Sequence, residues 1–368
     1  MTRTLLIPRL VILAACLGAP VVAQALNTEA QLASVSPAIN EQTFVPVGGI
    51  DQWISIRGQN RDNPVILMLH GGPGVSNAPF APAFTPWEDD FTIVEWDQRG
   101  AGRTFGRNGA QGTGVLSIDR LTQDGIALTQ HLRSRLQKDK IVLFALSFGS
   151  VIGLNMVQAR PELFAAYVGS GQFINAADGD ALGYRLTLEQ ARAVQNTEAI
   201  KALEAMGPPP WRDVKTRSAA KGWATRMTKD DDPASRMNVP AMLKALPDYS
   251  DADVKSLAAG MAFSTEPLVR DAMSFDARSF GPRFPIPLFI FQGADDLNTP
   301  TALVQRWFAD LDAPAKAIMI VEHASHGAFY THSEQLGQFL GERVRPLAVG
   351  KYVKRERRSH VAVPRLRN

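Results

Sequence analysis

Cysteine is almost absent from this sequence of 368 residues. Its single cysteine, Cys16, lies inside an N-terminal segment that we expect to be removed by cleavage after Ala25. The mature chain would then have no thiol, which excludes disulfides, a cysteine nucleophile and cysteine metal ligands, and suits an oxidising compartment. Because Leu13–Cys16 resembles a lipoprotein cleavage box, lipid anchoring at Cys16 is an alternative to free release.

Long hydrophobic runs are also missing. The most apolar segment, Leu10–Ala23, is too short and too interrupted for a membrane span. It follows Arg3 and Arg9 and leads into the small-residue cleavage pattern Ala23-Gln24-Ala25. We therefore expect residues 1–25 to be a signal peptide, the protein to be secreted or periplasmic, and no stable membrane span to be present.

The body of the chain has no excess of positive charge. The formal net charge is +3, but residues 345–368 alone contribute +7, from eight Arg or Lys and one Glu, which leaves −4 elsewhere. We expect residues 346–368 to form a basic, solvated C-terminal tail, although such a tail can also contact anionic lipid. No nucleic-acid partner is expected. With 45% hydrophobic and 20% charged residues, the composition is that of a globular protein.

Apolar runs alternate with helical patterns through most of the chain. "TFVPVGGIDQWISIRG" predicts a hairpin, and "PVILMLHGGPG", "FTIVEWDQRGAGRT", "KIVLFALS" and "FAAYVGSG" predict buried strands. Residues 116–136 and 148–159 have the pattern of helices. Nearly continuous apolar strands indicate an α/β fold, with a mostly parallel sheet covered by helices on both faces.

The pattern changes over residues 172–283, which are helix-prone, charged and rich in Met. Strands resume at "IPLFIFQGADD" and "AIMIVEHASH", with helices expected at 300–311 and 332–344. We predict one core, formed by 26–171 and 284–345, with a helical cap at 172–283 inserted before the last strands.

Candidate catalytic residues follow the predicted strands, where α/β sheets place ligand chemistry. Ser147 in "LFALSFGS" is followed by Asp295 or Asp296 and then by His323 or His326. A serine hydroxyl needs a base to take its proton, histidine is that base near neutral pH, and a carboxylate orients the imidazole. Serine, acid and histidine in this chain order are typical of α/β-hydrolases.

The segment around Ser147 departs from the usual G-x-S-x-G elbow, because Ala145 replaces the first glycine while Gly149 keeps the second. We expect the extra methyl to be tolerated at the end of a strand, where φ is negative. The upstream "HGGPG" loop would point a backbone N–H at a developing oxyanion. Gly72 and Phe148 are the predicted donors of this oxyanion hole.

Together, "HGGPG", "WDQRGAGRT", the serine elbow, "GADDLNTP" and "HASHGAF" resemble the α/β-hydrolase superfamily, and the first two resemble the prolyl iminopeptidase group. The resemblance spans about residues 42–345. The family pattern G-x-x-D-x-x-x-P favours Asp296 over Asp295, and the turn in "ASHGAF" favours His326 over His323. The resemblance also implies that Asp97 and Arg99 support the loop beneath the site, and we expect the two residues to form a structural ion pair.

His70 opens the "HGGPG" loop, and we expect it to be structural, not a base. Prolyl iminopeptidases hold the free amine of the substrate with cap carboxylates, since a buried ammonium needs a counter-charge. "MAFSTEPLVRD" resembles one such segment and offers Glu266, whose alternatives are a surface charge or a helix N-terminal acid. The second family glutamate has no equivalent near Trp223, and the acids at 230–232 are typical of a solvated loop.

These observations predict a secreted serine hydrolase, first of all an aminopeptidase that releases N-terminal proline or a similar small residue from a small peptide. The alternative is an esterase, lactonase or amidase with the same triad and no need for a free amine. A non-catalytic binding protein on a hydrolase scaffold is a more remote alternative. Serine at the elbow disfavours epoxide hydrolases and dehalogenases, which have aspartate there. No metal cluster, phosphate loop or dinucleotide fingerprint is present in the sequence, so no cofactor and no metal are expected.

Overall fold

A computed structural model describes residues 37–229, 232, 234, 238–246 and 248–349. The predicted signal peptide, Cys16 and the tail beyond residue 349 lie outside the described residues. The first residues of the predicted tail belong to a short helix, α13 (Arg345–Ala348). In the described part of the chain, no helix is long and apolar enough to cross a membrane.

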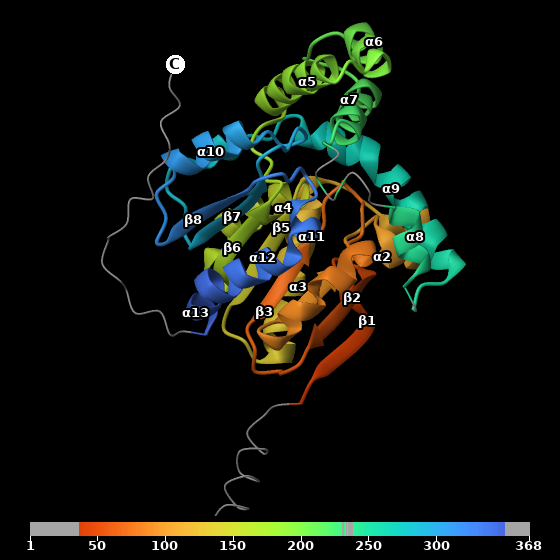
Figure 1. Cartoon of the computed structure of the whole chain (residues 1–368). Helices are drawn as coiled ribbons and strands as arrows, with labels where there is room; N and C mark the ends of the chain where they lie inside the picture. Colours follow the sequence, from red (N-terminus) through yellow and green to blue (C-terminus); the bar gives the residue numbers. More distant parts are fainter. Residues whose placement is uncertain (1–36, 230–231, 233, 235–237, 247, 350–368) are drawn as a thin grey trace, which may run out of the picture. The chain divides into compact units, whose positions relative to one another are not determined.

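An eight-stranded sheet with the order β1-β2-β4-β3-β5-β6-β7-β8 forms the centre of the structure (Figure 1). β1 and β2 form the predicted hairpin, β2 also runs antiparallel to β4, and all other neighbours are parallel. The prediction of a mostly parallel sheet is therefore confirmed. The strands are β1 (Ile39–Val47), β2 (Ile50–Gly58), β3 (Val65–Leu69), β4 (Thr92–Trp96), β5 (Ile141–Leu146), β6 (Phe164–Ser170), β7 (Leu288–Gly293) and β8 (Lys316–Val321).

Each face of the sheet is covered by its own set of helices. Leu143 and Ala145 of β5 point into a core with α3, α4 and α10, whereas Val142 and Phe144 point into a core on the opposite face. Alternation along a strand directs successive side chains to opposite faces, so both faces are apolar. The first set is α3 (Ile118–Leu136), α4 (Gly149–Ala159) and α10 (Thr301–Asp310). The second set is η1 (Ala78–Asp89), α11 (Ala328–Thr331), α12 (Ser333–Phe339), η5 (Leu340–Val344) and α13.

Two helical segments were not predicted from the sequence. η1 is a 3₁₀ helix that contains Pro82 and Pro86, and prolines normally indicate a turn. α2 (Gly102–Thr113) is interrupted at Gly109, and its several glycines make it look like a loop. A short 3₁₀ segment, η2 (Pro161–Leu163), precedes β6.

Residue 171 ends the predicted core segment, and the chain from there to β7, here called the insertion (residues 172–287), is helical as predicted. No strand occurs among its described residues, although Asn175 and Asp276 form an isolated bridge. Its helices are α5 (Ala176–Ala193), α6 (Thr197–Met206), α7 (Val214–Arg226), α8 (Val239–Lys244), α9 (Asp251–Ala272) and η4 (Ala277–Phe280).

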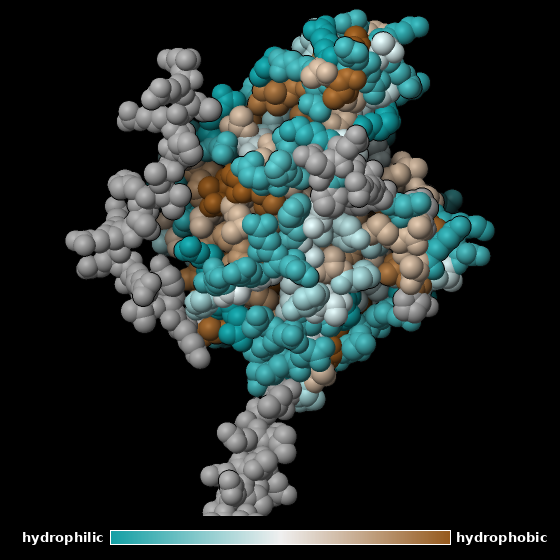
Figure 2. Space-filling model, in the orientation of Figure 1, coloured by the Kyte–Doolittle hydropathy of each residue, from teal (hydrophilic) through white to brown (hydrophobic). Residues whose placement is uncertain are grey.

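The insertion lies at the end of the sheet where β5, β6 and β7 finish. α5, α6 and α7 lie beyond the carboxyl ends of these strands (Figure 1). α9 packs against α2, where Ser264 Oγ donates a hydrogen bond to Gly100 O, and the end of α9 joins the core through Leu268 and Ala272. Hydrophilic and apolar residues are interspersed over its visible surface (Figure 2), so it resembles a solvated helical layer.

Candidate active site

Ser147 lies in a strained turn between β5 and α4. Its φ is +50°, in the left-handed region, and its N–H donates to Ser170 O at 2.9 Å. A Cβ at Gly149 would lie 2.5 Å from Leu69 O and 2.6 Å from His70 O. Only glycine fits there, because the start of α4 is pressed against the end of β3. The turn therefore presents the serine at the end of the sheet.

The alanine that replaces the first elbow glycine has a matching glycine opposite it. Ala145 is fully buried in β5 and does not have a positive φ. A Cβ added at Gly153 of α4 would lie 3.1 Å from Ala145 Cβ. The methyl of Ala145 thus takes up space that Gly153 leaves free.

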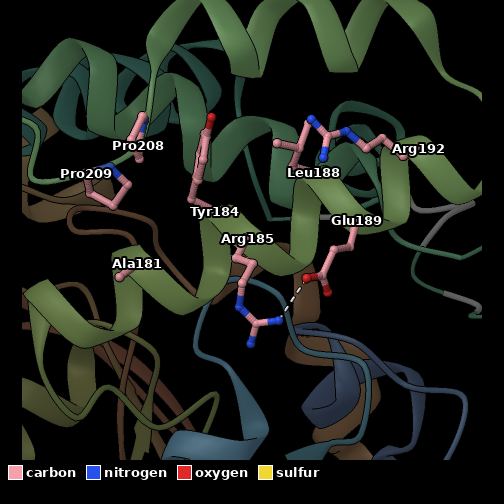
Figure 3. A pocket seen from close by; sticks show the side chains of 8 residues that line it. All are labelled: Ala181, Tyr184, Arg185, Leu188, Glu189, Arg192, Pro208 and Pro209. Atoms are coloured by element: carbon pink, nitrogen blue, oxygen red, sulfur yellow. Dashed lines mark hydrogen bonds and ion pairs between the residues drawn. The ribbon is translucent and has the colours of Figure 1, made fainter.

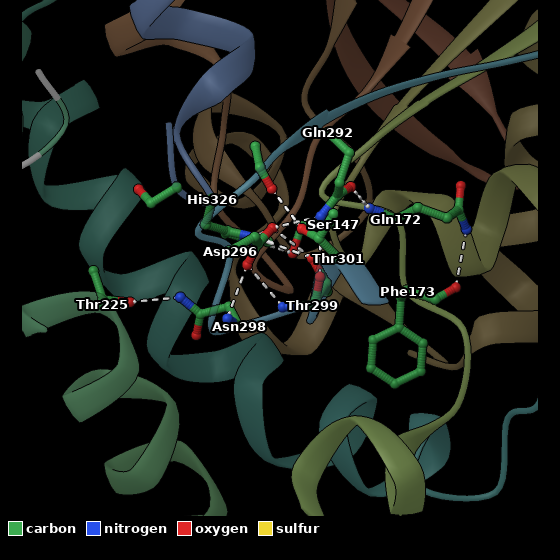
Figure 4. A network of polar contacts seen from close by, with 12 residues as sticks. Ser147, Gln172, Phe173, Thr225, Gln292, Asp296, Asn298, Thr299, Thr301 and His326 are labelled. Atoms are coloured by element: carbon green, nitrogen blue, oxygen red, sulfur yellow. Dashed lines mark hydrogen bonds and ion pairs between the residues drawn. The ribbon is translucent and has the colours of Figure 1, made fainter. Parts of the chain in front are cut away.

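His326 connects Ser147 to Asp296 (Figure 4). Its Nε2 lies 2.9 Å from Ser147 Oγ, and its Nδ1 lies 2.8 Å from Asp296 Oδ2. Because an ionised carboxylate only accepts hydrogen bonds, Nδ1 carries the proton and Nε2 is left to accept the serine proton. The three side chains form a continuous hydrogen-bonded chain from a buried acid to a half-buried serine.

Asp296 is held in its ionised form although its side chain is fully buried. Burial alone raises its pKa, but the charge and hydrogen bond of His326, with hydrogen bonds from Thr299, hold the pKa below its ordinary value. Its other donors are Asn298 N at 2.8 Å and Gln292 Nε2 at 2.9 Å. A charged, fully hydrogen-bonded carboxylate is suited to stabilising an imidazolium.

The neighbouring acid and histidine lie elsewhere. Asp295 is paired with Lys229 Nζ at 2.7 Å, and 32% of its side chain is exposed. His323 is exposed and has a φ of +55°, and it lies in the turn that precedes His326. Of the sequence candidates, the structure thus brings Asp296 and His326 to Ser147, as the family pattern indicates.

The "HGGPG" loop lies against the serine. A Cβ at Gly71 would lie 3.0 Å from Ser147 Cβ and 3.6 Å from its Oγ. Gly72 has φ +110° in this loop, and Phe148 follows the serine at the N-terminus of α4. Both predicted oxyanion donors are therefore on the segments that border Ser147, and their role stays a prediction.

His70 joins two loops beneath the site. Its Nε2 accepts from Gln98 N at 3.1 Å, and its Nδ1 lies 3.0 Å from Gly71 O. Burial lowers the pKa of His70 to about 4, outweighing the hydrogen bond to Gly71. The ring is therefore neutral near pH 7, and its contacts are those of a structural link between the loops after β3 and β4.

The ion pair expected between Asp97 and Arg99 is not formed in the described structure. Arg99 is paired with Asp124 of α3 at 2.7 Å and donates to Gly48 O. Asp97 accepts from Arg103 N at 2.7 Å, and burial raises its pKa to about 6. The prediction of an ion pair between these two residues was therefore wrong, because Asp97 points to the start of α2 and Arg99 points to α3.

Three residues around the triad were not identified from the sequence. Thr299 Oγ1 donates to Asp296 at 2.7 Å, and Gln292 Nε2 donates to both Asp296 and Thr299 O. Gly171 has φ +57°, and a Cβ there would lie 2.7 Å from His326 Cε1. The signal for Gly171 was its place directly after "FAAYVGS", at the same sheet edge as Ser147.

Glu266 has the surroundings of a surface charge, which was one alternative from the sequence. Its side chain is 58% exposed and pairs with Arg270 one turn further along α9. The buried face of that helix includes Gly260, Ser264 and Leu268. Nothing in these contacts supports a substrate-binding role for Glu266.

Several cavities border the insertion in the part of the chain that the structure describes, and two of them lie along α5. One of about 290 Å³ lies between α5 and the chain after α6, and includes Tyr184, Arg185 and Pro208 (Figure 3). Another of about 390 Å³ lies between α5 and the loop of Asp296. Neither is lined by Ser147. Among the described residues, no group of three or more His, Cys, Asp or Glu could hold a metal ion.

Comparison with known proteins identifies the family to which the chain is similar. A family model described as "Serine aminopeptidase, S33" matches residues 60–332. A probable aminopeptidase, YbaC of Bacillus subtilis, is 26% identical over 76% of this chain and 88% of its own length. A probable proline iminopeptidase of Streptomyces coelicolor is 27% identical over 76% of this chain and 87% of its own length.

Solved structures show the same fold. The proline iminopeptidase of Mycobacterium smegmatis superposes with a TM-score of 0.59, over 85% of this chain and 100% of the other, at 15% identity. At that identity the likeness establishes the α/β-hydrolase fold alone. The family model covers well over half of the chain, and the relatives are aminopeptidases by name. The chain therefore belongs to the serine aminopeptidase family of α/β-hydrolases.

Proposed function

We propose that this protein is a serine hydrolase in which Ser147, His326 and Asp296 act as a catalytic triad. The observation that carries the proposal is the hydrogen-bonded chain from Ser147 Oγ through the imidazole to the buried carboxylate of Asp296. That arrangement supplies a nucleophile, a base and an orienting acid in one line.

The reaction proceeds through an acyl-enzyme. Ser147 Oγ attacks the substrate carbonyl while His326 Nε2 takes the hydroxyl proton, and the backbone amides of Phe148 and Gly72 hold the oxyanion. His326 gives the proton to the leaving amine or alkoxide as the bond to the carbonyl carbon breaks. Water then attacks the ester on Ser147, His326 takes its proton, and the acid is released with Ser147 restored.

Active-site labelling tests the triad directly. A fluorophosphonate probe should label the wild type and should not label Ser147→Ala, with circular dichroism showing an intact fold. Ser274→Ala is the matched control, because its exposed hydroxyl donates only to Asp271 O. Labelling of Ser147→Ala at the wild-type rate would disprove the assignment.

We infer that the acyl group comes from the N-terminal residue of a small peptide, so that the enzyme releases N-terminal proline or a similar small residue. The support is the naming of its relatives as aminopeptidases and proline iminopeptidases. The expected substrate is proline p-nitroanilide with a free amine.

A second candidate is hydrolysis of esters, lactones or amides without a free amine. The observation in its favour is that three acids of the insertion are already engaged. Asp180 is paired with Arg217 and Lys221, Asp232 accepts from Ser325 N, and Glu266 is exposed beside Arg270. A buried ammonium needs a counter-charge that is not already neutralised. The charge of Asp180 is already offset by two cations, and Glu266 is paired at the surface.

One comparison distinguishes the two candidates. An aminopeptidase should hydrolyse proline p-nitroanilide and lose at least about 100-fold in kcat/KM when the substrate amine is acetylated, since its amine contact is removed. An esterase should instead prefer short p-nitrophenyl esters, with acetylation having little effect on the anilide.

We also propose export with cleavage after Ala25, on the sequence pattern of residues 1–25. Mass spectrometry of the protein from its native host should give a mature N-terminus at Leu26. A diacylglyceryl group on Cys16 would support lipid anchoring instead.

A further inference from the structure

Two loops of the core carry the acid and the histidine, and one part of the insertion contacts both of them. The acid loop (residues 294–299) contains Asp296, and the histidine loop (residues 322–327) contains His326. Four residues of the insertion reach these loops from α7 and the chain after it. They are called the clamp residues and are Lys221, Thr225, Lys229 and Asp232.

Three clamp residues hold the acid loop. Lys221 Nζ donates to Asn298 O at 2.8 Å, and Asn298 Nδ2 donates to Thr225 Oγ1 at 3.0 Å (Figure 4). Lys229 Nζ pairs with Asp295 at 2.7 Å. Asp295 directly precedes Asp296, and Asn298 N donates a hydrogen bond to the carboxylate of Asp296. The contacts therefore fall on both sides of the acid.

The fourth clamp residue holds the histidine loop. Ser325 N donates to Asp232 Oδ2 at 2.5 Å, and Ser325 precedes His326 directly. Asp232 is only 1% exposed, so the expectation of a solvated loop was wrong for this residue. A buried backbone N–H must have an acceptor. The acceptor of Ser325 N is supplied by the insertion instead of by the core.

We propose that Asp232 is a positioning residue for His326, and that the clamp residues make triad alignment depend on the insertion. The inference rests on the proposed function of the triad. His326 must keep Nε2 at 2.9 Å from Ser147 and Nδ1 at 2.8 Å from Asp296 at the same time. The core ties the two loops together through Asp295 N and Ala324 O, and Asp232 fixes the next peptide along.

Both oxygens of Asp232 accept a backbone N–H, and the residue is almost fully buried. Its Oδ1 accepts from Ala234 N at 2.7 Å, and its Oδ2 accepts from Ser325 N. The carboxylate therefore acts on the turn that carries the histidine, and its removal should affect the chemical step more than substrate binding. Displacement of a catalytic group by about 1 Å can lower a rate by about 100-fold.

The test compares Asp232→Ala, Asp232→Asn and Asp213→Ala with the wild type. Asp213→Ala is the matched control, because Asp213 caps α7 through Thr216 N, and in the described structure no hydrogen bond joins its side chain to either loop. Asp232→Asn keeps a carbonyl oxygen for Ser325 N and is the conservative rescue. The readouts are kcat and KM on the best substrate, together with the rate of fluorophosphonate labelling.

Asp232→Ala should lower kcat and the labelling rate by about 100-fold while KM changes less than about twofold. Asp232→Asn should stay within about fivefold of the wild type, and Asp213→Ala within about twofold. An unchanged labelling rate in Asp232→Ala, or a raised KM with unchanged kcat, would overturn the proposal. A wild type that the probe does not label would instead overturn the proposed function.

Should Asp232→Ala not fold, Thr225→Val and Lys229→Met carry the test, since they remove side-chain contacts to the acid loop at exposed positions. Each should lower kcat severalfold with unchanged KM. Wild-type kcat in both variants would overturn the proposal.

Discussion

The core around Ser147 and the insertion above it hold their polar residues in different ways. In the core, Asp296 is surrounded by donors from its own loop and from Gln292, and glycines such as Gly149 and Gly171 allow close approach of the backbone. In the insertion, most ion pairs lie at the surface, as between Arg192 and Glu204. Exposed pairs contribute little to stability, whereas buried ones fix geometry.

The difference indicates a division of work. The core determines which bond-breaking chemistry is possible, because its distances are set by buried contacts that tolerate little change. The insertion has a small apolar cluster of its own, around Ala191, Ala199, Leu203 and Met227. Its exposed residues can vary without loss of the fold.

The largest predicted effect is a difference in kcat between substitutions at two adjacent acids, Asp296 and Asp295. Asp296→Asn should lower kcat by about 10⁴-fold, because an amide stabilises the wrong imidazole tautomer. Asp295→Asn should lower kcat no more than a few-fold, since it only weakens a half-exposed pair with Lys229. Steady-state kinetics on both variants measure this. Equal losses at the two positions would mean that Asp296 is not the triad acid.

A second pair of variants compares a glycine of the core with one of the insertion. Gly171 and Gly207 both have positive φ, +57° and +67°, so alanine strains the backbone at each. At Gly171 the new methyl would meet His326, whereas at Gly207 it would meet nothing within 4 Å. Gly171→Ala should lower kcat by about 100-fold and Gly207→Ala by less than twofold. Similar kcat values in the two folded variants would show that the space beside His326 is not critical.

Much of the core could be predicted from the sequence because each feature has a local signal. Buried parallel strands are continuous apolar runs, and the chain order Ser147, Asp296, His326 is visible without a structure. The hairpin turn at Gly48 and Gly49 was equally visible. These predictions needed only the identity of neighbouring residues.

The remainder depended on contacts between distant segments. Asp232 looked like part of a polar loop, and only the fold brings it to Ser325. Arg99 was expected to pair with Asp97 because they are close in sequence, yet Asp124 of α3 is its partner. Glu266 was selected by a loose motif, and helical periodicity places it opposite the buried face of α9. Long-range packing determines the partners of Asp232 and Arg99, and it leaves no local pattern in the sequence.

The third prediction concerns buried groups of the core that titrate. The lowered pKa of His70, about 4, means that the unfolded chain binds more protons between pH 6.5 and 4, so stability is lost as pH falls through that range. The raised pKa of Asp97, about 6, has the opposite sign, and its protonation stabilises the fold as pH falls below 6. The two effects offset each other in the wild type.

Asp97→Asn removes the stabilisation that protonation of Asp97 provides below pH 6 and leaves the opposite effect of His70. Between pH 7 and pH 5 the variant should lose about 1 kcal/mol more unfolding free energy than the wild type loses. Urea titrations at the two pH values measure the difference. Glu204→Gln in the insertion is the control and should follow the wild type, since Glu204 is exposed. A smaller loss in Asp97→Asn than in the wild type would contradict the sign of the Asp97 shift.

The smallest effect should come from Glu266→Gln. The side chain is more than half exposed and pairs only with Arg270 in the described structure, so its loss should change kcat/KM for proline p-nitroanilide by less than about twofold. Glu189→Gln is the matched control, because Glu189 forms the same kind of exposed pair with Arg185 on α5. A fall in kcat/KM of more than about tenfold for the free-amine substrate alone, absent in Glu189→Gln, would restore Glu266 as an amine contact. It would also mean that α9 moves when substrate binds, because in this structure the carboxylate is paired at the surface. Kinetics with the free and acetylated anilides therefore test whether Glu266 contacts the substrate amine or only forms its surface pair with Arg270.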